Sequence, residues 1–64
     1  MNAYLLSQLW EVRNCRFDPH PNHMSFLGYI AACWHLDAIH GDEYNLLVDL
    51  SRNAAEYCRK DLGV

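Results

Sequence analysis

The 64-residue chain has little that would support catalysis or nucleotide binding. It contains three glycines, none in a phosphate-binding loop, and its serines lack a G-x-S-x-G context. A chain of this size also has little room to enclose a substrate pocket of about 300 Å³ or more. We therefore expect no enzymatic activity and no cofactor.

Positive charge is also scarce. The chain has five Lys+Arg against eight Asp+Glu, which gives a formal net charge of −3. Nucleic-acid-binding proteins usually carry a basic patch or stripe, whereas the cations near the end of this chain alternate with acidic residues. The composition therefore disfavours direct binding to DNA or RNA.

No uninterrupted apolar run is long enough to cross a membrane. The best candidate is broken by His35, Asp37 and His40, and the start of the chain shows no charged region or cleavage site typical of a signal peptide. Three cysteines are an odd number without a CxxC pair, so they cannot all form disulfides within one chain. We expect a soluble cytoplasmic protein that does not enter a membrane.

Apolar residues, by contrast, are abundant. They make up 52% of the chain, and the aromatic residues include two Trp, four Tyr and two Phe. A chain of this length buries only about 60% of its unfolded surface, so such a content exceeds what one small core can hide. Oligomerisation is a common remedy, and a two-fold homodimer is its simplest form.

Apolar periodicity predicts an all-α fold. Helices are expected over residues 2–13, 24–40 and 42–62 in a single domain spanning residues 1–64. The second and third helices are expected to form an antiparallel hairpin within a dimeric helical bundle. The segment 14–22, which contains two prolines, separates the first helix from this hairpin.

Several residues are candidates for the ends of these elements. Asn2 could cap the first helix, and Asn22 or Ser25 could cap the second. Gly41 suits the left-handed position that follows a helix, so we expect the second helix to end there. Phe17 is the predicted apolar anchor that ties the proline-containing loop to the core.

The stretch from Ser25 to His40 is apolar around nearly its whole circumference, so as a helix it must be covered on every side. Small residues four apart, Gly28 and Ala32, predict one close neighbour. The last helix has an apolar arc of roughly 200°, which is wide enough for two partners. The predicted interface comprises Trp10, Phe26, Tyr29, Cys33, Trp34, Asp37, His40 and Tyr44.

Asp37 is unusual because the helical pattern places its carboxylate among apolar residues. A buried carboxylate needs a partner, so Asp37 is expected either to form an ion pair with Arg13, Arg16 or Arg52 or to cap a neighbouring helix. Recognition by a partner protein is the alternative role. No nucleophile or second acid accompanies Asp37, so it is not expected to be catalytic.

One set of side chains has the chemistry of metal ligands. Cys15, His20 and His23 could bind zinc, with Cys33 as a fourth ligand. The spacing matches no known zinc finger, and the same residues are explained as polar loop positions and apolar cysteine. A zinc-binding module is therefore an alternative to a protein-binding function.

The segment Ala38–Ala54, AIHGDEYNLLVDLSRNA, resembles the turn and helix of small helical open reading frames of enterobacterial phages and prophages. The resemblance implies an accessory or host-modulating product that binds a host protein. We thus expect a homodimer that modulates a larger protein. A transcription-linked regulator is a further alternative, although the last helix carries Asp49 and Glu56 where a recognition helix would be basic.

Overall fold

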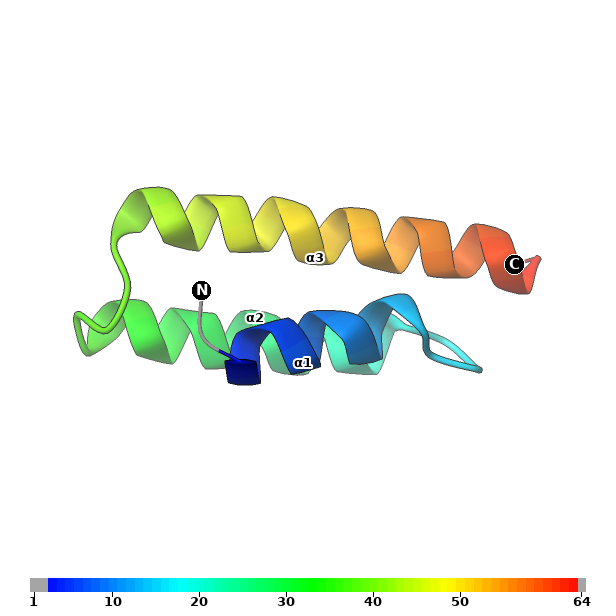
Figure 1. The fold of residues 1–64 in the computed structure, drawn as a ribbon, viewed down its shortest axis with the longest axis horizontal. Helices are drawn as coiled ribbons and strands as arrows, with labels where there is room; N and C mark the ends of the chain where they lie inside the picture. Colours follow the sequence, from blue (N-terminus) through cyan, green and yellow to red (C-terminus); the bar gives the residue numbers. More distant parts are fainter. Residues whose placement is uncertain (1–2, 64) are drawn as a thin grey trace.

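A computed structural model describes residues 3–63. This part of the chain forms three α-helices and no strand: α1 spans Ala3–Arg13, α2 His20–His35 and α3 Gly41–Leu62. The helices lie side by side, each in contact with the other two, in a rod of 38 × 17 × 17 Å (Figure 1). The all-α prediction is confirmed, whereas Asn2, the predicted first cap, lies outside the described residues. None of these helices has the length and hydropathy required to cross a membrane.

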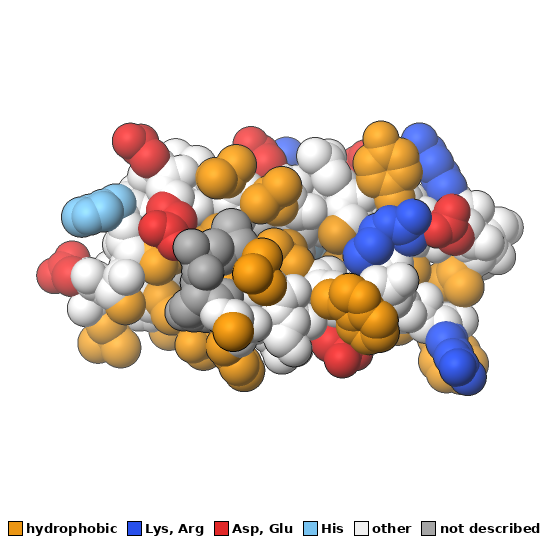
Figure 2. Space-filling view, viewed as in Figure 1, with side chains coloured by type: hydrophobic (Ala, Val, Ile, Leu, Met, Phe, Trp, Pro, Cys, Tyr) orange, Lys and Arg blue, Asp and Glu red, His pale blue; other side chains and the backbone are white. Residues whose placement is uncertain are grey.

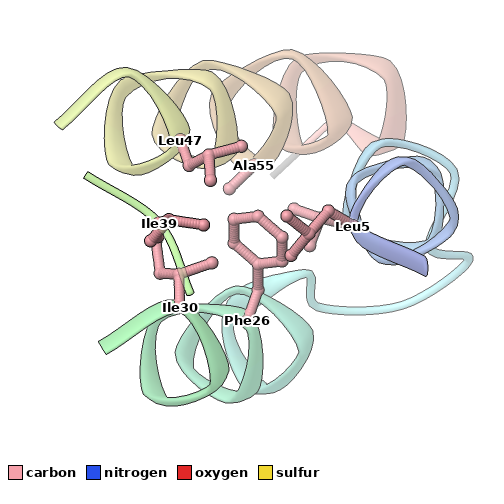
Figure 3. Packing of buried hydrophobic residues seen from close by; sticks show 7 residues of the cluster. Leu5, Phe26, Ile30, Ile39, Leu47 and Ala55 are labelled. Carbon is pink, nitrogen blue, oxygen red and sulfur yellow. The ribbon is translucent and has the colours of Figure 1, made fainter. Parts of the chain in front are cut away.

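The core lies where the three helices meet (Figure 3). Leu5 and Val12 are seven residues apart on α1, so they point to the same side of that helix. The remaining buried hydrophobic side chains of the cluster are Phe26, Ile30, Ile39, Leu47 and Ala55. Full burial of a large apolar side chain stabilises a fold by about 1.5–3 kcal/mol. A core of so few side chains makes each of them important.

Helix α2 begins earlier than the sequence predicts. The Asp18 carboxylate accepts a hydrogen bond of 3.0 Å from the His20 backbone N–H, which satisfies one of the unpaired donors of the first turn. Pro21 lies within that turn, where its missing N–H would have had no helical partner. The predicted caps Asn22 and Ser25 are wrong, because the helix has already begun before them.

Helix α2 also ends earlier than predicted, at His35. Asp37 has a left-handed φ of 58°, its N–H bonds to the Trp34 carbonyl at 3.0 Å, and the Ala38 N–H bonds to the Cys33 carbonyl at 2.8 Å. This pair of hydrogen bonds is the Schellman motif. Asp37 thus takes the position predicted for Gly41, which instead begins α3. Short polar residues such as Asp occupy this conformation more readily than bulky ones.

The predicted buried ion pair of Asp37 is therefore wrong. Asp37 is exposed in the connection between α2 and α3, because the helix that would have buried it has ended. Two of its candidate partners bind elsewhere: Arg13 pairs with Asp61 at 2.6 Å, and Arg52 pairs with Asp49 at 3.5 Å.

The loop between α1 and α2 is anchored by Pro19 rather than by Phe17. Phe17 is 83% exposed, whereas Pro19 is buried. The Cys58 thiol on α3 donates a hydrogen bond of 3.2 Å to the Cys15 carbonyl, which adds a second attachment. The predicted anchor is wrong, because the rigid ring of Pro19 fills the inward position and leaves Phe17 in solvent.

Candidate interaction surface

The described part of the chain exposes an unusual amount of large apolar surface. Twelve large hydrophobic side chains of residues 3–63 are each at least 37% exposed. Isolated exposed apolar residues are normal, but contiguous ones mark interaction surfaces. Figure 2 shows hydrophobic side chains at several places on the visible face, with polar and charged side chains between them.

We call one group the α1–α3 face, defined as Leu6, Trp10, Leu46, Leu50 and Tyr57. Leu6 and Trp10 are one turn apart on α1, and Trp10 is 63% exposed. The three α3 residues are separated by intervals of four and seven, so they share one side of that helix. They lie beside the buried stripe of α3 rather than within it.

Arg13 joins the two halves of this face. Its guanidinium carbon lies 6.0 Å from the centroid of the Tyr57 ring, and its Nη1 pairs with the Asp61 carboxylate at 2.6 Å. The Lys60 ammonium lies 5.2 Å from the centroid of the same ring. Exposed contacts of these kinds contribute roughly 1 kcal/mol or less each, so they orient side chains more than they stabilise the fold.

A second group surrounds the connection between α2 and α3. The Trp34 and Tyr44 rings stack with centroids 4.7 Å apart and an interplanar angle of 25°. Trp34 is half-exposed, and Asp37 and His40 are exposed in the same connection. The structure thus brings together four residues of the predicted interface, which we call the connection cluster: Trp34, Asp37, His40 and Tyr44.

The other predicted interface residues lie elsewhere. Trp10 belongs to the α1–α3 face, and Tyr29 packs against Tyr4 with ring centroids 4.8 Å apart. Cys33 is half-buried on α2. Phe26 is 1% exposed and lies in the core of the single chain, so it offers no surface to a partner. Its place in the predicted interface is corrected accordingly.

The prediction of an interface omitted Leu6, Leu46, Leu50 and Tyr57. The signal for the three α3 residues was the 200° apolar arc, part of which must remain exposed if a single core covers one side of the helix. The small-residue prediction also fails within the chain. A Cβ atom at Gly28 would meet no atom of residues 3–63 within 4 Å, so neither α1 nor α3 approaches it closely.

A polar contact between α2 and α3 lies at the edge of the core. His23 Nδ1 is 2.6 Å from the Ser51 hydroxyl oxygen, and the Ser51 side chain is fully buried. Burial lowers the pKa of His23 below its ordinary value of 6.5, and the nearby positive charges of His20, Arg59 and Arg52 lower it further. The contact is therefore made by neutral His23 near neutral pH.

This lowered pKa predicts that the protein loses stability in mild acid. Below pH 6.5 the unfolded chain takes up a proton at His23 more readily than the folded chain, so the free energy of unfolding falls as the pH drops through the folded pKa. Urea titrations between about pH 7.5 and pH 5 should reveal the fall. The variant His23→Gln should show a shallower pH dependence, whereas the exposed control His35→Gln should retain it. Equal slopes in all three proteins would contradict the assignment.

The arrangement of the described residues does not support the two alternatives, a zinc site and a DNA-recognition helix. Among residues 3–63, no group of three or more His, Cys, Asp or Glu side chains is arranged to hold a metal ion. Cys15, His20 and His23 are therefore not brought together as a ligand set. On α3, Asp49 and Glu56 are exposed, so its outward side does not have the basic character of a DNA-recognition helix.

Comparison with known proteins assigns no function to the exposed apolar surface. The chain matches no protein-family model, no curated protein and no solved structure.

Proposed function

We propose that this chain is a small, non-enzymatic protein that acts as a helical homodimer and modulates a larger protein. In this proposal α2 and α3 form an antiparallel hairpin, and the α1–α3 face binds a second copy. The observation that carries the proposal is the exposure of five large apolar side chains on one side of a chain with a very small core. Covering such a surface would remove apolar area from water, which favours association.

The connection cluster is the proposed site for the larger protein. It lies where α2 ends and α3 begins, and it includes a half-exposed Trp stacked on a Tyr, two residue types enriched at binding hot spots. The resemblance of Ala38–Ala54 to small phage and prophage proteins supports a host protein as the target. Both groups of residues would then be used, one for each partner.

Light scattering coupled to size-exclusion chromatography tests the homodimer. The expected mass across micromolar concentrations is twice the 7.5 kDa of the chain. A mass of 7.5 kDa throughout that range would contradict the dimer, because a face this apolar would then be stable in water on its own.

Affinity capture from the host of origin tests the modulator function. Dimeric wild-type protein is expected to retain a specific larger protein, and Trp34→Ala and Asp37→Ala are expected to release it while remaining dimeric. Met24→Ala is the matched control, because Met24 is exposed on α2 outside the connection cluster. Retention of the same protein by all variants would remove the connection cluster from the proposal.

A further inference from the structure

The charges on the rod are separated along its length. Near the start of α3 the charged side chains are Asp37, Asp42 and Glu43, all acidic. Towards the end of α3 lie four cations, Arg13, Arg16, Arg59 and Lys60, together with the carboxylates Glu11, Asp18, Glu56 and Asp61. Figure 2 shows that most basic side chains on the visible face lie towards the end where α3 finishes. The rod therefore has one end whose charged side chains are all acidic and another end that carries four of the five cations.

Two arrangements bring the α1–α3 faces of two copies together with two-fold symmetry. In the first the rods run in the same direction, so α3 of one copy packs against α1 of the other and the two acidic ends meet. In the second the rods are reversed, so α3 packs against α3 and the acidic end of each copy meets the end of the other that carries most of the cations. Since like charges in contact oppose association, the charge distribution favours the reversed arrangement.

The exposed side of α3 has the spacing that this arrangement needs. Six residues follow each other at alternating intervals of three and four, which is the heptad spacing of paired helices: Glu43, Leu46, Leu50, Asn53, Tyr57 and Lys60. We call these six residues the α3 seam. Its two ends are charged with opposite signs, and three of its four inner residues are exposed large hydrophobics.

The α3 seam is complementary to the α3 seam of a second copy that runs in the opposite direction. Helix α3 spans Gly41–Leu62, so its midpoint falls between Ser51 and Arg52. Reversal about that midpoint gives one pair of apolar residues, one pair of an acid with a base, and one pair of an apolar with a polar residue. The pairs related by the reversal are Leu46 with Tyr57, Leu50 with Asn53, and Glu43 with Lys60. In the arrangement with both rods in the same direction α3 packs against α1 instead, so Glu43 of one copy does not meet Lys60 of the other.

We infer that the occupant of the α1–α3 face is a second copy of this chain with its rod reversed, held by the α3 seam with Glu43 of each copy opposite Lys60 of the other. This inference rests on the proposed homodimer and specifies its geometry. A standard interface buries about 800 Å² per partner, which is less than a fifth of the 4489 Å² surface of the chain. One long side of the rod is comparable to that size. Asp49 and Glu56 border the seam on its solvent side and are screened there by salt.

Charge reversal at the two ends of the seam tests the geometry by sedimentation equilibrium. Glu43→Lys places two Lys–Lys contacts in each homodimer, and Lys60→Glu places two Glu–Glu contacts. Each variant is expected to dimerise about tenfold more weakly than wild type. Glu11→Lys is the matched control, because it makes the same charge change at an exposed α1 position outside the α1–α3 face, and it should dimerise within about twofold of wild type.

An equimolar mixture of the two variants provides the decisive measurement. In the mixed dimer the introduced lysine of one chain faces the introduced glutamate of the other, and the two unchanged residues, Lys60 and Glu43, face each other. The mixture is therefore expected to recover wild-type association, as is the double variant. Because mixing changes no chain, altered folding cannot produce this recovery. A dimer that none of the changes affects overturns the reversed geometry but leaves the homodimer intact. A wild-type chain that stays monomeric overturns both.

Discussion

Replacing Phe26 with alanine is expected to unfold most of the chain at 25 °C. The ring lies at the centre of the core between the three helices (Figure 3), and removal of a buried Phe side chain costs about 3–5 kcal/mol. A single hydrophobic core in a domain of 64 residues rarely supplies more than about 3–5 kcal/mol, so most or all of the stability would be lost. Circular dichroism during heating and urea titration would show the loss as reduced helicity and a lower midpoint.

Phe17→Ala is the matched control for this prediction. It removes the same side chain from a position that is 83% exposed, and surface substitutions usually change stability by about 0.5 kcal/mol or less. A Phe26→Ala protein that remained fully helical but lost only its self-association would contradict the structure. That result would restore Phe26 to the interface, where the sequence had predicted it.

Replacing Leu50 with glutamate is expected to convert the proposed dimer into a folded monomer. Leu50 lies near the middle of the α3 seam, so the two-fold axis would bring two new carboxylates into an apolar interface without partners. We expect dimerisation to weaken by about 100-fold or more, since each uncompensated charge costs several kcal/mol. Sedimentation equilibrium measures this change. Circular dichroism should show retained helicity, because Leu50 is already partly in solvent.

Leu36→Glu makes the same change outside the seam. Leu36 is 81% exposed in the connection between α2 and α3, so its replacement should leave the monomer–dimer equilibrium nearly unchanged. If Leu50→Glu and Leu36→Glu dimerised equally well, another surface would have to hold the two copies together. The outer side of α2 around Gly28 would then be the next candidate, because nothing in the described part of the chain covers it.

The helices were predictable because their apolar spacing is a local property. Residues 42–62 were predicted as helical, and α3 spans Gly41–Leu62. The ends of α2 were not predictable in the same way. A proline normally disfavours helix at the residue before it, yet His20 begins α2, and its N–H donates a hydrogen bond to the Asp18 carboxylate. At the other end Asp37 adopts a left-handed conformation that sequence patterns assign to glycine.

The sequence predicted that apolar side chains would remain exposed, but it did not predict which residues they would be. An excess of apolar residues over core capacity follows from composition and chain length, and twelve exposed large side chains agree with it. Which residues remain exposed depends on how far each helix is rotated towards the core. The predicted face of α2 assumed that the helix continued to Gly41, so the early end at His35 removed Asp37 and His40 from that face.

The sequence by itself determined that this protein is helical, small and richer in apolar residues than one core requires, because these properties follow from composition and local periodicity. Only the tertiary structure decided that Phe26 and Ile30 point inward while Trp10 and Leu46 point outward. Both kinds of residue satisfy the same hydrophobic pattern. The difference arises because three helices can place only one stripe of each helix against a shared core, and the packing of the whole chain selects that stripe.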